Sequence, residues 1–161
     1  MGGRSVREAS GCEGAADACV LCGEATAVPS PLSSPAPAGD GGRVCPVCGW
    51  RAGDSPDADL PRPRVEVVYY LRWDARVKIG TTADPRRRLA VIWHHELLAF
   101  EPGGRALERA RHEQFAHLRE GGEWFRADPE LREHAAALAS GIPPWHSYAR
   151  WVADALRRNV S

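Results

Sequence analysis

The sequence predicts an α+β protein, with a small sheet of about three strands flanked by helices and a cysteine-rich module in front of it. Three observations predict this fold class. A β-branched and aromatic run at 65–71 is followed by a second one at 77–79, apolar residues recur at helical spacing over 105–120, and four of the five cysteines form two close pairs.

The chain has 161 residues, enough for one ordinary domain and a smaller module. Its zero net charge conceals an asymmetry, because residues 1–60 hold 4 basic and 8 acidic residues whereas residues 61–161 hold 17 basic and 13 acidic ones. A mildly basic C-terminal part is compatible with phosphate contacts. No apolar run approaches the roughly 18 residues that a membrane span needs, and the first residues lack the apolar core of a signal peptide. We therefore expect a cytoplasmic protein without a membrane partner.

The cysteine pairs indicate a metal site. Two C-x-x-C-G knuckles, Cys19-Val20-Leu21-Cys22-Gly23 and Cys45-Pro46-Val47-Cys48-Gly49, are separated by 22 residues. Each spacer lets both thiolates point to one ion at about 2.3 Å, and the glycine permits a tight turn beneath the sulfurs. Paired cysteines in a reducing compartment favour a metal over disulfides, and a redox pair is disfavoured because no thioredoxin-like pattern surrounds them. We predict one structural zinc ion bound by Cys19, Cys22, Cys45 and Cys48.

The segment between the knuckles is rich in proline, serine, alanine and glycine, so the ion has to stabilise this module in place of a core. Cys12 has no partner at knuckle spacing and is predicted to be a free thiol whose role is open. The predicted organisation is a flexible N-terminus at 1–16, a zinc-ribbon-like module at 17–52, a proline-rich linker at 53–63, a mixed domain at 64–131 and a C-terminal helical extension at 132–161.

The mixed domain is predicted to begin with a β-hairpin. Its two strands, at 65–70 and 77–79, are separated by the turn Arg72-Trp73-Asp74-Ala75-Arg76. Asp84-Pro85 then supplies an N-cap and a first helical residue, and the helix carries Leu89 and Ile92 inward. A third strand is predicted over 96–101.

Three further helices complete the prediction. The first spans about 105–120 and is stopped by Gly121-Gly122. Its expected apolar stripe comprises Leu107, Ala110, Phe115 and Leu118. Asp128-Pro129 begins the second helix, and the third, at 145–158, covers the sheet with an apolar side comprising Trp145, Tyr148, Val152 and Ala155 or Leu156.

Lys78 is the only lysine, against 20 arginines. Arginine stays charged in protein sites, whereas a lysine can lose its proton through burial or a cationic neighbour and act as a base. The alternative is a biased composition in which one lysine stands at a solvated strand. Arg86, Arg87 and Arg88 form a basic cluster in the first turns of a helix, and together with Lys78 they are predicted to contact nucleic-acid phosphates; the alternative is a solvated basic turn.

The order of these motifs resembles the GIY-YIG nuclease superfamily, and most closely its branch described as a phage-type DNA-binding domain, in which the second motif reads KIG and the segment closes with GEWF. The residues that carry the resemblance are the tyrosine strand at 67–71, Val77-Lys78-Ile79-Gly80, Arg88, Glu108 and Gly122-Glu123-Trp124-Phe125. The match covers about residues 65–131. Two positions depart from the family: Ile92 stands where many members carry a histidine, and the asparagine that often follows the metal-binding glutamate is not evident.

The resemblance implies a metal-dependent DNA endonuclease or nicking enzyme that hydrolyses phosphodiester bonds. Glu108 would bind one Mg²⁺ ion, Arg88 would grip the scissile phosphate, and Tyr69 or Lys78 would deprotonate the attacking water. His112 would assist the leaving group or, equally, pack beside the site as a structural residue. For Glu108 the alternative is an ordinary helix ion pair with Arg105, Arg111 or His112.

Two other functions stay open at this point. One is a noncatalytic DNA-binding protein on the same fold, in which the two departures mark lost chemistry. The other is an adaptor whose zinc module and C-terminal helix bind a protein. Trp124 and Phe125 are predicted either to anchor the core or to stack on a base. The choice between DNA and RNA, the oligomeric state and the pathway stay open too.

Overall fold

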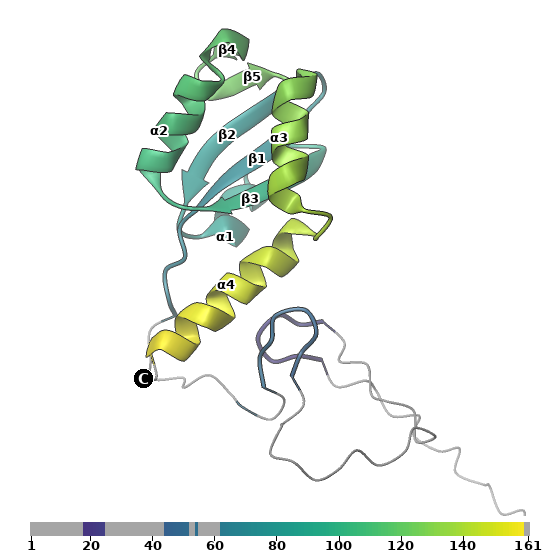
Figure 1. Cartoon of the computed structure of the whole chain (residues 1–161), viewed down its shortest axis with the longest axis vertical. Coiled ribbons are helices and arrows are strands. Elements are labelled where there is room, and N and C mark those ends of the chain that lie inside the picture. Colours follow the sequence, from purple (N-terminus) through teal and green to yellow (C-terminus); the bar gives the residue numbers. More distant parts are fainter. Residues whose placement is uncertain (1–17, 25–43, 52–53, 55–61, 160–161) are drawn as a thin grey trace, which may run out of the picture.

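The structure is a computed structural model that describes residues 18–24, 44–51, 54 and 62–159 (Figure 1). The predictions for Cys12, for the flexible N-terminus at 1–16 and for most of the linker at 53–63 lie outside the described residues. Within the described part, no helix is long and apolar enough to cross a membrane.

A five-stranded antiparallel sheet forms the centre of the domain, with the strand order β3-β1-β2-β5-β4. The strands are β1 (Val67–Trp73), β2 (Arg76–Thr82), β3 (Glu96–Pro102), β4 (Arg119–Gly121) and β5 (Trp124–Arg126). The α+β class is confirmed, but the expected number of about three strands is wrong by two. The additional pair is a short hairpin whose turn includes Gly122 at φ 54°, a backbone conformation that glycine adopts without strain.

The predicted hairpin of β1 and β2 is confirmed. Asp74 turns the chain at φ 50°, and the register pairs Tyr69 with Gly80 and Leu71 with Lys78. Because side chains alternate along a strand, Tyr69, Leu71, Lys78 and Gly80 share one face of the sheet. We call it the α1 face, because Leu89 of helix α1 (Pro85–Ala90) packs there.

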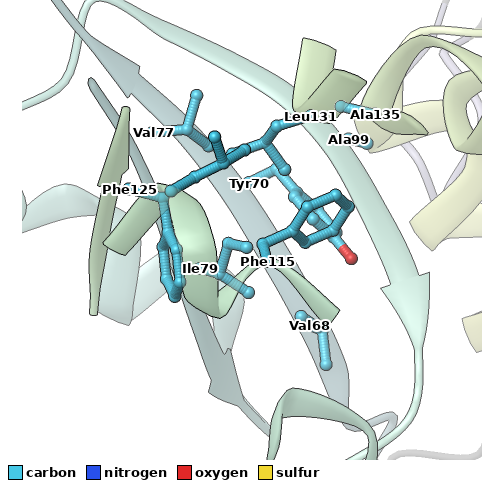
Figure 2. Close-up of a cluster of buried hydrophobic side chains, with 10 residues drawn as sticks. Val68, Tyr70, Val77, Ile79, Ala99, Phe115, Phe125, Leu131 and Ala135 are labelled. Carbon is cyan, nitrogen blue, oxygen red and sulfur yellow. The ribbon is translucent and has the colours of Figure 1, made fainter. Parts of the chain in front are cut away.

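The opposite face, called the α3 face, carries the largest buried cluster (Figure 2). Helix α3 (Pro129–Ala139) covers it and begins as predicted, with the Asp128 side chain accepting a hydrogen bond from the Glu130 amide. The cluster contains Val68, Tyr70, Val77, Ile79, Ala99, Phe115, Leu118, Phe125, Leu131 and Ala135. Phe125 therefore anchors the core, which was one of its two predicted roles; the other was to stack on a base.

Helix α1 is capped as predicted, since Asp84 accepts from the Arg87 amide at 3.1 Å. It ends at Ala90, so Ile92, predicted within this helix, lies beyond its end and still packs against the α1 face. Helix α4 (Pro144–Asn159) covers the same face, with Trp145 and Tyr148 packed there as predicted. Trp151 takes the place expected for Val152, and Leu156 packs on the cysteine module instead. The Trp145 and Tyr148 rings lie 5.1 and 5.9 Å from that of Phe100.

Helix α2 (Arg105–Gln114) is shorter than the predicted span of 105–120. A 3-10 turn at Ala116–Leu118 and strand β4 take up the remainder, and this tighter turn carries both Phe115 and Leu118 into the core. Ala110, assigned to the apolar stripe, is exposed. Of the residues of α2 none is fully buried, so the half-buried side that faces the sheet holds polar groups.

The second side of α4 packs against the cysteine module. Ala149 and Ala153 are buried together with Cys45, Cys48 and Trp50. Two arginines of α4 add hydrogen bonds, from Arg150 to the Val47 carbonyl at 2.5 Å and from Arg157 to the Gly49 carbonyl at 2.9 Å. Helix α4 therefore connects the N-terminal module to the sheet.

Candidate functional site

The four knuckle cysteines lie together, with all their sulfur atoms within 4.8 Å of one another. Two pairs, Cys19 with Cys48 and Cys22 with Cys45, are 3.6 Å apart. Four thiolates around one zinc ion at about 2.3 Å would be separated by roughly 3.8 Å. The predicted ligand set can therefore hold a metal ion, and four sulfur ligands are typical of zinc.

The two knuckles have the same local structure. In each, the glycine amide donates to the carbonyl of the first cysteine at 2.8 Å, and Gly23 and Gly49 have φ of 77° and 71°. This is the tight turn that the sequence predicted, and it needs glycine because other residues adopt positive φ at a cost. The turn places both sulfurs of a knuckle on the same side.

Protons compete with a cation for the thiols of this site. Burial raises the pKa of the Cys22 thiol to about 11 and raises that of Cys48 as well. Burial acts in the same direction at Cys19, but the backbone amides of Cys22 and Leu21 outweigh it and bring the pKa of that thiol to about 7. A cation that binds all four sulfurs must therefore displace protons at neutral pH.

A second group of polar residues lies around Gly80 on the α1 face. A Cβ atom added to Gly80 would lie 2.6 Å from Tyr69 Cζ and closer still to the hydroxyl oxygen. Only a glycine lets the Tyr69 ring cross β2 so closely. Arg88 Nε donates to the Tyr69 hydroxyl oxygen at 3.4 Å, which leaves the hydroxyl hydrogen available for another acceptor.

We expect Gly80→Ala to displace the Tyr69 ring and to destabilise the protein by about 1–3 kcal/mol, as overpacking in a core does. Thermal or urea unfolding measures the effect. Gly121→Ala is the matched control, because a Cβ atom there would meet no atom within 4 Å. Equal stability of the two variants would show that Tyr69 does not need the space above Gly80.

Lys78 Nζ lies 2.6 Å from Glu123 Oε2, in the turn between β4 and β5. The Lys78 side chain is 14% exposed and that of Glu123 39% exposed. This charge-assisted contact holds the lysine in place beside the strand. Glu123 belongs to the GEWF motif but was not predicted as a site residue, and nothing in its spacing links it to Lys78, which is 45 positions earlier.

Glu108 lies on α2 and is half-buried. Its carboxylate lines a hollow of about 230 Å³ together with Arg105, Arg109 and His112. Within the described part of the chain it forms no ion pair and no side-chain hydrogen bond, so the helix ion pair considered as an alternative is not formed there. The pKa of the Arg88 guanidinium is raised by the hydrogen bond to Tyr69 and by the carboxylates of Glu123 and Glu108.

A buried ion pair orients α2. Arg111 donates to the carboxylate of Glu101 in β3 through Nε at 3.0 Å and through its terminal nitrogen, and Tyr70 Oη donates to the same carboxylate at 2.9 Å. Burial alone would raise the pKa of Glu101, but these partners hold it below its usual value. The pair fixes the rotation of α2, and Glu108 lies one turn before Arg111.

His112 has both ring nitrogens engaged. Nε2 lies 2.9 Å from the Ile79 carbonyl, which requires a hydrogen on Nε2, and Nδ1 lies 2.9 Å from an Arg119 nitrogen. The Ile79 carbonyl is at the outer side of β2, beyond the three residues that pair with β5. His112 therefore joins α2 to the open edge of β2, and this geometry corresponds to the packing role rather than to assistance of a leaving group.

The predicted phosphate-binding arginines are all exposed on α1. The Arg86 guanidinium lies over the Trp145 ring at 4.9 Å, whereas Arg88 turns toward Tyr69. The site residues that were predicted from separate segments lie about the middle of β2: Lys78 belongs to it, Tyr69 pairs with Gly80, Arg88 contacts Tyr69, and His112 contacts the Ile79 carbonyl. Glu108 is linked to this group through its charge, which contributes to the raised pKa of Arg88. Comparisons with protein-family models, with curated proteins and with solved structures find no match for this chain.

Proposed function

We propose that this protein is a metal-dependent DNA endonuclease or nicking enzyme of the GIY-YIG type, whose zinc module aids DNA targeting. One observation carries the proposal: Arg88 contacts the Tyr69 hydroxyl and also lies in the field of two carboxylates, one of which, Glu108, has no partner within the described residues. A phosphodiesterase needs a phosphate-gripping cation, a proton acceptor and a metal ligand close together.

Glu108 is the residue that would hold Mg²⁺. The support is the carboxylate itself, which no other side chain of the described residues uses, because this ion takes only one or two protein carboxylates and keeps several waters. The other residues that line the hollow, Arg105, Arg109 and His112, are basic and add no ligand for the ion. When bound, the cation supplies charge neutralisation at the phosphate. Arg88 binds a non-bridging phosphate oxygen with its planar fork. Tyr69 would accept a proton of the attacking water as a phenolate, its own hydroxyl proton having first been released to bulk water.

The departures from the family support a second candidate, a DNA-binding protein on the same fold without cleavage. Ile92 is apolar and packs against the α1 face, and neither ring nitrogen of His112 is available for proton transfer. In that case Arg86, Arg87 and Arg88 bind phosphates without chemistry.

One assay separates the two candidates. Supercoiled plasmid is incubated with the full-length, zinc-loaded protein, with and without Mg²⁺, and binding to the same DNA is measured in parallel across a salt series. Mg²⁺-dependent nicking supports the endonuclease. Salt-dependent binding without any nicking supports the noncatalytic protein, and absence of both would reject the two proposals together.

Lys78→Arg tests the role of the lysine. Since Lys78 is paired with Glu123 at 2.6 Å, we expect its charge to matter, and the arginine variant to bind DNA like the wild type and to keep most of its cleavage rate. Lys78→Ala, the control that removes the charge, is expected to lower both the affinity for DNA and the cleavage rate. Normal binding with lost cleavage in Lys78→Arg would instead identify Lys78 as the base.

A further inference from the structure

Three aromatic side chains gather where the β1–β2 hairpin turns. The Trp73 ring stacks on His95 with centroids 4.5 Å apart and meets Trp93 edge-on at 6.1 Å. Trp93 is 82% exposed, the most exposed of the large hydrophobic residues in the described part of the chain. A tryptophan normally buries its large apolar surface, so one held at the surface calls for an explanation.

The loop that carries Trp93 is held in place. His95 donates its amide to the Arg72 carbonyl at 2.8 Å, and the Asp74 amide donates to His95 Nδ1 at 3.3 Å. His94 Nδ1 lies 2.7 Å from the Ile92 carbonyl. The ring of Trp93 is therefore presented by a positioned loop, which limits the entropy lost when a ligand stacks on it.

The same face continues toward the candidate site. By strand alternation, Trp73, Leu71 and Tyr69 of β1 lie on the α1 face, beside Arg76, Lys78 and Gly80 of β2. Trp124 of β5 is paired with Lys78 and lies on this face too. The Arg76 guanidinium carbon lies 5.3 Å from the centroid of the Trp124 ring, and Lys78 Nζ lies 5.4 Å from it. Arg76, Lys78, Trp124, Trp73 and Trp93 form what we call the stacking strip.

The charges of the strip favour an anionic ligand. Arg76 is exposed and has no acidic partner within the described residues. Glu123 is paired with Lys78 at 2.6 Å and Glu96 with Arg72 at 3.0 Å, whereas Asp74 lies 3.7 Å from a ring nitrogen of His95. Aromatic rings alternating with cations are the arrangement by which proteins bind single-stranded nucleic acid, whose unpaired bases stack while its phosphates are held by the basic groups.

We propose that the stacking strip binds unpaired bases of a DNA strand that continues from the candidate site, so that the substrate is a duplex with a single-stranded portion. The proposal rests on the proposed function and specifies its substrate. From Lys78 to Arg76 the strip runs about 7 Å along β2, roughly two nucleotides at the rise of a duplex strand. Inside a fully paired duplex the bases are stacked on one another, so no interior base face is free for Trp93.

The test compares three DNA ligands without added Mg²⁺: a blunt duplex, the same duplex with a single-stranded tail, and the tailed duplex with abasic tail positions. The wild type is expected to bind the tailed duplex more tightly than the other two. The affinity of Trp93→Ala for the tailed duplex is expected to be roughly 5- to 150-fold lower than that of the wild type, which is the effect of removing one base–aromatic stack. Its affinity for the blunt duplex should be unchanged. Tails of both polarities are tested.

Two variants serve as controls. Trp93→Phe keeps an aromatic ring and should retain most of the preference, and Val91→Ala, which changes a 74% exposed residue of the same loop, should behave like the wild type. Equal affinity of the wild type for blunt and tailed DNA would overturn the inference while leaving the proposed function intact. A change in oligomeric state in Trp93→Ala, with unchanged affinity for tailed DNA, would also overturn it in favour of a contact between copies. No binding to any DNA would reject both.

Discussion

Cys48→Ser is expected to lose the bound zinc and the packing of the N-terminal module on α4. The four sulfurs lie within 4.8 Å of one another, and Cys48 is 1% exposed, beside Trp50, Ala149 and Ala153. Small zinc modules gain about 10 kcal/mol or more from the metal, so loss of one thiolate leaves this one without its main source of stability. The zinc content measured by elemental analysis should fall from one ion per chain toward none. Limited proteolysis should cut the module while the sheet domain survives.

The matched control is Cys12→Ser, which removes the one cysteine outside the two knuckles and should keep the full zinc content. Acidification offers an independent check. Because burial raises the pKa of Cys22 to about 11, its thiol is protonated at neutral pH without the ion, and zinc affinity should fall steadily as the pH is lowered. Full zinc content in Cys48→Ser would show that the knuckles do not form one site.

Local signals allowed much of the fold to be predicted. Asp84-Pro85 and Asp128-Pro129 each begin a helix where expected, because a capping side chain and a proline act within a single turn. The hairpin β4–β5 was missed because it carries no clear local signal. Its strands have three residues each, too few to show alternation, and Gly121-Gly122 serves as well for a helix stop as for a tight turn.

Contacts between distant segments could not be predicted. The pairs Lys78–Glu123 and Glu101–Arg111 join residues whose charges are ordinary in the sequence and become significant only when the strands are placed. The side of α4 that packs on the cysteine module illustrates the same limit. The aromatic side of the helix was expected, but Ala149 and Ala153, which pack on the cysteine module, are compatible with a buried or an exposed position in any helix.

The candidate site was predicted through family resemblance more than through physical pattern. A glutamate on an exposed helix forms i,i+4 pairs as readily as it binds a metal, so spacing alone did not distinguish the two roles of Glu108. The arrangement of α2 does bear on the choice. Arg111 is taken by Glu101 and His112 by the Ile79 carbonyl, which removes two of the three partners considered for Glu108.

Glu108→Gln is expected to lower Mg²⁺-dependent DNA cleavage by about 100-fold or more, the size of effect seen when one group that stabilises the charge of a transition state is removed. Glutamine keeps the length and helix propensity of the side chain but is a far weaker ligand for a hard cation. DNA binding should be equal or slightly tighter at low salt, because one negative charge near the phosphates is lost. Plasmid nicking and oligonucleotide binding measure the two effects separately.

The matched control is Glu113→Gln, the same change at an exposed position of the same helix, which should cleave and bind like the wild type. Raising the Mg²⁺ concentration adds a second criterion. If Glu108 binds the ion, the wild type should saturate at a lower Mg²⁺ concentration than Glu108→Gln, whereas a purely structural role would lower the rate without moving that midpoint. Wild-type cleavage by Glu108→Gln would assign the metal to other residues and remove the support that its unpaired carboxylate gives to the proposed mechanism.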